Sequence, residues 1–112
     1  QRIFKLTPYF FSYTISKAAL HTLTKTSAMK LAPKIRVNAI APGPVLKNKR
    51  QTLKHFNKQS KNTLLGKPVE IEDICKTAYL LAIGKTITGQ VIAIDSGQSL
   101  NWKTPDIIGI NE

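Results

Sequence analysis

The sequence has little cysteine and no long apolar run. A single cysteine, Cys75, excludes both an internal disulfide and a four-cysteine zinc site. No apolar stretch approaches the ~20 residues of a membrane-spanning helix, and the opening residues lack the pattern of a signal peptide. His21 and His55 have no partners at metal-ligand spacing, so both are interpreted as ordinary surface residues. We therefore expect a cytoplasmic protein with no membrane partner and no metal site.

Acidic residues are also scarce. The 17 Lys and Arg outnumber the 6 Asp and Glu and give a net charge of +11. Such an excess indicates nucleic acid, an anionic membrane surface or an acidic ligand, or it only solvates the surface. No helix-turn-helix, zinc-finger or RNA-binding signature is present, and aromatic residues make up only 7%. We expect no nucleic-acid partner, and a basic anion-binding module remains the weakest alternative.

What the chain does have is the composition of a globular core, with 42% apolar and 21% charged residues in a length of 112. That length allows one domain at most. Because the first residue is Gln1 rather than Met, we expect the sequence to begin inside a longer protein. Residues 1–112 are interpreted as a single partial domain.

Hydrophobic periodicity predicts two helices and two strands in alternation. The first helix should run from Phe11 to Ala32, where Pro33 closes it, and the second should follow Pro68 and end at Gly84. Glu70, Glu72 and Asp73 stand in the first turn of the second helix, where the helix dipole favours acidic side chains. The predicted buried stripe of this helix consists of Ile71, Ile74, Cys75, Ala78, Leu81 and Ala82. The predicted strands are Ile35–Ala41 and Gln90–Asp95, while the tail after Leu100 has no periodicity.

The stretch 45–67 between these elements is polar and basic, and it is interpreted as a variable, partly helical segment. Strands separated by helices pair in parallel, so the predicted fold class is α/β. Two strands alone leave a sheet edge that requires further neighbours.

Tyr13 and Lys17 stand four residues apart on the first predicted helix, which places both on one face. A neighbouring ammonium stabilises a phenolate, and a phenol so tuned can exchange a proton with a substrate oxygen. Taken alone, this spacing is a weak signal, because it occurs by chance on many helices.

Three segments together make a stronger pattern. Residues 13–20 (YTISKAAL), 34–43 (KIRVNAIAPG) and 88–97 (TGQVIAIDSG) resemble, in order and spacing, the catalytic helix and the last two strands of short-chain dehydrogenases/reductases. The resemblance implies the C-terminal part of a Rossmann-like, doubly wound parallel sheet. It also implies an NAD(P)-dependent oxidoreductase with NAD or NADP as cofactor, NADP slightly favoured, that acts on a small-molecule carbonyl, alcohol or pterin-like substrate.

The resemblance assigns roles to six residues. Tyr13 would be the general acid/base and would also contact the cofactor, Lys17 would assist it and bind the nicotinamide ribose, and Pro42, Gly43, Pro44 and Val45 would pass against the nicotinamide. The alternative interpretation of Pro42 and Gly43 is a plain turn that ends the strand. The helix that carries Tyr13 would also pair with a second subunit, which makes the complete enzyme a homo-oligomer. Asn38 and Cys75 are interpreted as structural, with Cys75 in the core.

The sequence also departs from the family. The N-terminal strands and the glycine-rich phosphate turn have no counterpart, and neither does the catalytic serine, for which Ser12 and Ser16 are wrongly spaced. Lys47 stands where many members have a threonine, and Ser96 where glycine is commoner. We therefore expect the isolated chain to be inactive without an N-terminal half, and a non-catalytic relic is the alternative.

The run from Pro42 onward is similar to family members that reduce pterins or dihydrofolate-like compounds. In that reading 45–67 is a substrate loop, and the acidic tail of a folate would suit Lys49, Arg50 or Lys54. The alternative for each of these side chains is simple solvation.

Overall fold

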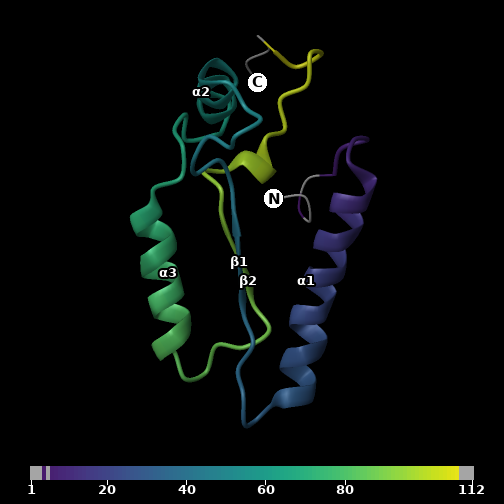
Figure 1. The fold of residues 1–112 in the computed structure, drawn as a ribbon, viewed down its shortest axis with the longest axis vertical. Helices are drawn as coiled ribbons and strands as arrows, with labels where there is room; N and C mark the ends of the chain where they lie inside the picture. The colour runs from purple at the N-terminus through teal and green to yellow at the C-terminus, as the bar shows by residue number, and fades with distance from the viewer. Residues whose placement is uncertain (1–3, 5, 109–112) are drawn as a thin grey trace.

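The computed structural model describes residue 4 and residues 6–108. The two strands, β1 (Ala39–Pro42) and β2 (Val91–Ile94), pair in parallel from Ala39 opposite Val91 to Pro42 opposite Ile94. Helices α1 and α3 lie on opposite sides of this pair, and α2 lies beyond the carboxyl ends of the strands (Figure 1). The remaining bounds are α1 (Phe11–Leu31), α2 (Leu53–Lys61), α3 (Ile71–Ile83) and a 3₁₀ turn, η1 (Gln98–Leu100). The predicted α/β class with a parallel sheet is confirmed.

Both predicted long helices form, with ends where the sequence places them. Helix α1 closes at Ala32, whose N–H donates to the Ala28 carbonyl, directly before Pro33. Helix α3 ends at Gly84, whose N–H donates to the Leu80 carbonyl. These ends depend on local chemistry, which is why the pattern of the sequence locates them.

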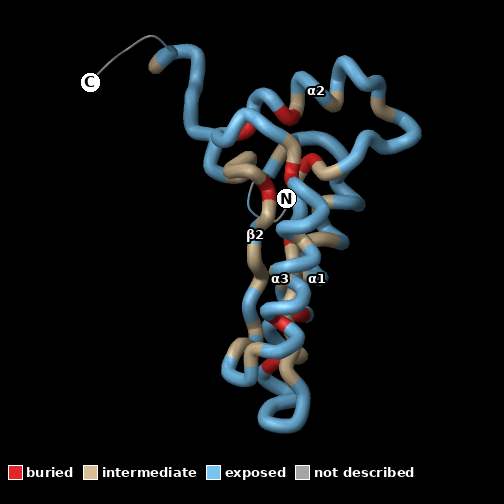
Figure 2. Tube along the Cα trace, turned by 90° about the vertical axis from the view of Figure 1, so that its left-hand side faces the viewer, coloured by how far each residue is buried: buried red, intermediate tan, exposed pale blue. Residues whose placement is uncertain are grey.

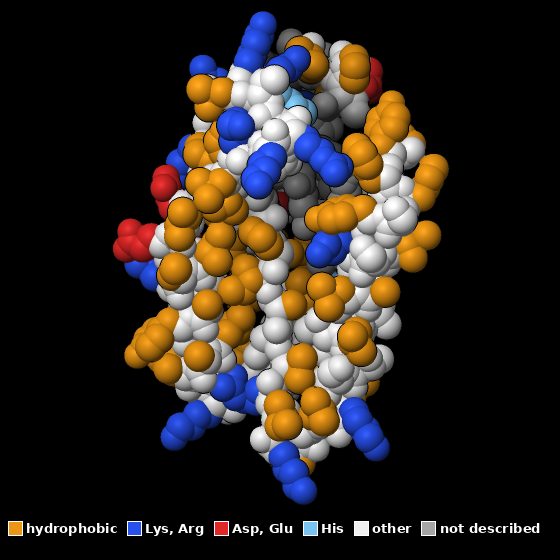
Figure 3. Space-filling view, viewed as in Figure 1, with side chains coloured by type: hydrophobic (Ala, Val, Ile, Leu, Met, Phe, Trp, Pro, Cys, Tyr) orange, Lys and Arg blue, Asp and Glu red, His pale blue; other side chains and the backbone are white. Residues whose placement is uncertain are grey.

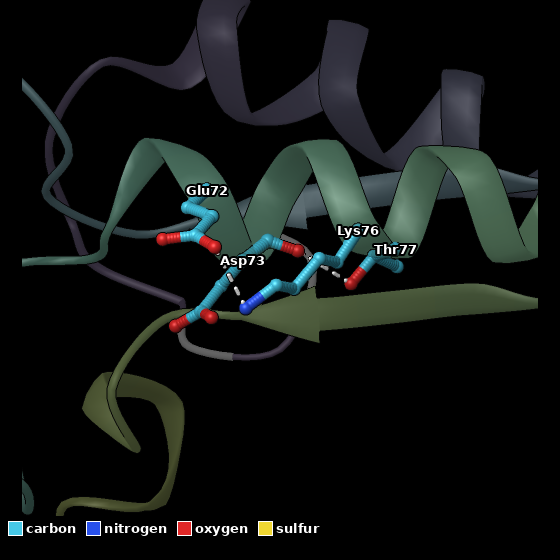
Figure 4. Close-up of polar contacts among 4 residues, drawn as sticks. All are labelled: Glu72, Asp73, Lys76 and Thr77. Atoms are coloured by element: carbon cyan, nitrogen blue, oxygen red, sulfur yellow. Dashed lines mark hydrogen bonds and ion pairs between the residues drawn. The ribbon is translucent and has the colours of Figure 1, made fainter.

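Acidic residues open α3, as its dipole favours (Figure 4). Glu72 Oε1 lies 2.9 Å from Lys76 Nζ one turn on, and Thr77 Oγ1 donates to the Asp73 carbonyl at 2.8 Å. Because the ion-paired side chains are about 70% exposed, water screens the pair, and it stabilises the helix by only ~0.3–0.5 kcal/mol.

Strand β1 is shorter than predicted, because it begins at Ala39 and not at Ile35. Before that point the side chain of Asn38 joins the two segments, beside a backbone bond from the Gly89 N–H to the Val37 carbonyl at 2.7 Å. Asn38 Nδ2 donates to the Ile87 carbonyl at 2.8 Å, and Asn38 Oδ1 accepts from Gln90 N–H at 3.0 Å. The structural role inferred for Asn38 is therefore correct, and β2, predicted from Gln90, starts one residue later for the same reason.

The side chain of Arg36 joins this approach to the end of α3. Its guanidinium donates to the carbonyls of Leu81 (2.6 Å) and Ala82 (2.7 Å). These carbonyls lie in the last turn of α3, where no helical N–H remains to bind them. A cation also suits the negative end of the helix dipole, so Arg36 ties α3 to the sheet.

The buried stripe predicted for α3 is largely wrong. Of its six residues only Leu81 is buried and Ile74 is half-buried, whereas Cys75 is exposed, contrary to the prediction that it packs in the core. Two strands of four residues are too narrow to cover the face of a 13-residue helix. Figure 2 shows how few buried positions result, and Figure 3 shows apolar side chains exposed along both flanking helices.

The turn after β2 is built around Asp95, which is only 6% exposed. Its carboxylate accepts from the N–H of Gly97 (3.0 Å) and of Ser99 (2.8 Å). Burial alone would raise the pKa of Asp95, but the hydrogen bonds from Ser99 and Gly97 outweigh burial and hold the pKa below its usual value. The ionised carboxylate thus fixes the start of η1 next to the end of β2 through these two hydrogen bonds.

Ser96 adopts φ 54°, a left-handed conformation that disfavours any residue with a Cβ. Relief of this strain predicts that Ser96→Gly raises the free energy of unfolding by about 1 kcal/mol. Denaturant unfolding measures the change, and Ser96→Ala, which loses the hydroxyl but keeps the Cβ, serves as the control. An equal gain in both variants would mean that the hydroxyl, and not the backbone, is the source of strain.

Candidate active site

A cleft of about 480 Å³ opens between α1 and the strands. Such a volume suits a small molecule or the reactive end of a cofactor. It reaches the carboxyl end of β1, the edge at which open parallel sheets bind their ligands. Helix α1 lines it with Tyr13, Lys17, Leu20, His21 and Thr24, and the sheet with Ala39, Ile40, Ala41, Pro42, Gly43 and Val91.

Tyr13 and Lys17 lie together on the cleft side of α1, as their spacing predicts. The Lys17 ammonium is 5.3 Å from the centre of the Tyr13 ring. At this distance the cation is attracted by the face of the ring. Ser16 Oγ donates to the Tyr13 carbonyl at 2.8 Å, so its hydroxyl is engaged with the helix backbone rather than with the phenol.

The turn after β1 divides the residues predicted to meet a cofactor. Pro42 and Gly43 line the cleft, as do Tyr13 and Lys17, whereas Pro44 and Val45 do not. Pro44 is buried, and its carbonyl accepts from the Val69 N–H at 2.8 Å. The structure thus brings four of the six predicted residues to one cavity, and their roles toward a cofactor remain predictions.

Gly43 has a structural reason to be glycine. Its N–H donates to the Ile94 carbonyl at 2.9 Å, which continues the pairing of β1 with β2. A Cβ at this position would lie 2.7 Å from Asp95 Cα and 2.8 Å from Asp95 Cβ. The strand ends approach too closely for any side chain, whatever else occupies the cleft.

His21 lines the cleft, although the sequence pattern predicted an ordinary surface residue. It is half-buried, and its ring meets the Phe4 ring edge-on at 6.0 Å. Within the described part of the chain its Nδ1 is buried and has no hydrogen-bond partner. The available signal was its position four residues after Lys17, on the same helix face. His55, in contrast, is exposed on α2 as predicted.

Lys47 turns back on its own loop. Its ammonium donates to the carbonyls of Asn48 (3.4 Å) and Gln51 (3.2 Å). Among residue 4 and residues 6–108, no group of His, Cys, Asp and Glu side chains is arranged to hold a metal ion. In the same part of the chain, no helix combines the length and hydropathy needed to cross a membrane.

The sequence of this chain is similar to a known protein family and to known reductases. Residues 4–99 match the family model described as enoyl-(acyl carrier protein) reductase. The short-chain dehydrogenase/reductase homolog YusR of Bacillus subtilis is 40% identical over 89 residues, which cover 79% of this chain and 69% of YusR. The dihydromonapterin reductase of Citrobacter koseri is 41% identical over 91 residues, which cover 80% of this chain and 37% of that enzyme.

Solved structures of reductases also resemble this chain. FolM alternative dihydrofolate reductase 1 from Brucella suis, in complex with NADP, superposes with a TM-score of 0.90 at 48% identity, over 94% of this chain and 42% of that one. The Brucella canis protein, also complexed with NADP, gives 0.87 and 50%, over 95% and 42%. The chain thus spans about two-fifths of these reductases, although more than two-thirds of YusR. With the Tyr13–Lys17 pair facing a cleft at the end of a Rossmann-like parallel sheet, the chain belongs to the short-chain dehydrogenase/reductase family.

Proposed function

We propose that this chain supplies the proton donor and the nicotinamide side of an NADPH-dependent reductase that acts on the C=N bond of a dihydropteridine. The observation that carries the proposal is the Tyr13–Lys17 pair, which faces a cleft at the carboxyl end of β1. Relatives named as dihydromonapterin and alternative dihydrofolate reductases support the substrate class.

The residues of the cleft fit the nicotinamide end of a dinucleotide. When bound, that group supplies a hydride to the carbon of the substrate double bond. The Lys17 ammonium can donate hydrogen bonds to the ribose hydroxyls. Pro42 and Gly43 line the cleft at the end of β1, and the lack of a side chain at Gly43 leaves room for the nicotinamide ring. NADP is favoured because both Brucella structures contain it, while a more distant neighbour from Leptospira, 28% identical, binds NAD+.

The proton is the contribution of this chain's own side chains. Reduction of a C=N bond leaves a negative nitrogen, which needs one proton for each hydride received. Tyr13 lines the cleft, and its hydroxyl can donate that proton, while the Lys17 ammonium stabilises the phenolate left behind. Water can then restore the phenol, because Tyr13 is 52% exposed.

Helix α1 also supports a homo-oligomeric enzyme. Ile15 and Leu23, which do not line the cleft, are each more than half exposed along this helix. A second copy of α1 would cover such side chains, and burial of apolar area favours that association.

An assay of NADPH consumption by the intact protein that carries this chain tests the proposal. Dihydromonapterin and dihydrofolate should both be reduced, and NADPH should serve better than NADH. A crotonyl thioester serves as the control, because the family model bears the name of enoyl reductases. Consumption with the thioester alone would assign a different substrate. No consumption with any of them would indicate a non-catalytic member of the family.

A further inference from the structure

The positive charge of this chain is concentrated at the end of the sheet to which the candidate active site opens. Residues 45–67 hold seven of the 17 basic residues and not one Asp or Glu. They form the segment that leaves β1, and their helix α2 lies beyond the carboxyl ends of the strands (Figure 1). The N-terminal turns of α1, which carry Tyr13, point to the same end of the sheet. The basic residues are Lys47, Lys49, Arg50, Lys54, Lys58, Lys61 and Lys67.

No acidic side chain in the described part of the chain neutralises this segment. The ion pair recorded there joins Lys76 to Glu72 within α3 (Figure 4). The Asp95 carboxylate is buried in its own turn, where it binds backbone N–H groups. The segment therefore presents uncompensated positive charge to any ligand.

Three of these lysines share one face of α2. Lys54, Lys58 and Lys61 surround a shallow hollow of about 590 Å³, together with Leu53, Asn57 and Asn62. The Asn101 amide donates to the Asn62 carbonyl at 3.2 Å, so the chain after η1 passes the same helix end. A lining of one leucine, two amides and three ammonium groups suits a ligand that carries anionic groups.

Helix stability alone does not account for the pattern. Lys58 and Lys61 occupy the last turn of α2, where a cation suits the helix dipole. Lys54 stands in the first turn, which has no acidic residue, and a cation is unfavourable there. A ligand anion at Lys54 would offset this cost.

Resting on the proposed function, we propose that Lys54, Lys58 and Lys61 form a subsite for the carboxylate-bearing tail of a dihydrofolate-type substrate. The two substrate names among the relatives differ in this feature, because dihydrofolate ends in glutamate carboxylates whereas the side chain of dihydromonapterin is an uncharged polyol. The subsite makes the enzyme prefer tailed pteridines, and the preference grows with the number of glutamates.

The test uses the intact protein with three substrates: dihydromonapterin, dihydrofolate and dihydrofolate triglutamate. The variant K54Q/K58Q/K61Q should raise KM for the triglutamate roughly tenfold, since each exposed ion pair contributes about 1.4- to 5-fold. KM for dihydrofolate should rise less, KM for dihydromonapterin should stay unchanged, and kcat should hold for all three. The difference should shrink as added salt screens the charges.

The matched control is K30Q/K34Q/K85Q, which removes the same charge from exposed lysines at or just after the carboxyl ends of α1 and α3, at the other end of the sheet from α2 (Figure 1). An equal rise of KM in the control would show an effect of net charge and overturn the subsite. Unchanged KM values in the α2 variant, with loss of binding only to a single-stranded RNA, would make the face a nucleic-acid surface and overturn it as well. Turnover without tail dependence removes this inference alone, whereas no turnover of any pteridine removes the proposed function.

Discussion

Replacement of Tyr13 by phenylalanine should lower kcat of the intact enzyme by roughly 10²–10⁴-fold, the usual contribution of a positioned general acid. The variant keeps the aromatic ring, whose centre lies 5.3 Å from the Lys17 ammonium, and loses only the hydroxyl that donates the proton. The affinity for NADPH should therefore stay within about twofold of the original, since the change affects the transition state and not cofactor binding. Steady-state kinetics and a fluorescence titration of NADPH measure the two quantities.

Tyr9→Phe is the matched control, because Tyr9 is 69% exposed and does not line the cleft. It should change neither kcat nor cofactor affinity. Lys17→Ala should reduce both in the active enzyme, because Lys17 both faces the phenol and is placed to hold the ribose. A Tyr13→Phe enzyme that retained most of its turnover would show that the proton comes from elsewhere, and the assignment of Tyr13 would be wrong.

Gly43→Ala should destabilise the fold by about 2–3 kcal/mol, in the range of an overpacked core. The added Cβ would lie 2.7 Å from Asp95 Cα, and a backbone atom at the end of a paired strand has little room to move away. To accept the methyl group, the strands must separate where Gly43 N–H binds the Ile94 carbonyl. Thermal and denaturant unfolding measure the loss.

Gly66→Ala separates this steric cost from the ordinary cost of losing a glycine. Gly66 has φ +67° and nothing within 4 Å of its virtual Cβ, so alanine there should cost only about 1 kcal/mol through the backbone. Gly43 shows no positive φ, so its cost comes from contact alone. Full stability of Gly43→Ala together with a loss of NADPH affinity would reverse this explanation and make the glycine a requirement of the cofactor.

The pair Tyr13 and Lys17 could be read from the sequence because a helix fixes the relation of residues four apart. Local chemistry likewise located the end of α1 before Pro33 and the end of α3 at Gly84. His21 obeys this rule too, yet it was missed, because what makes it a wall of the cleft is the sheet opposite and not its own helix.

The sequence by itself therefore determined the two long helices, their alternation with the two strands and the family, since all three depend on residue types at short or regular spacing. Only the tertiary structure decided where β1 begins, why Gly43 must lack a side chain and why Cys75 is exposed. The bonds of Asn38 to Ile87 and Gln90 join residues 49 and 52 apart in the chain. The approach of Gly43 to Asp95 likewise spans the two strands. Local periodicity cannot predict contacts between distant segments, because such contacts form only when the packed strands bring the segments together.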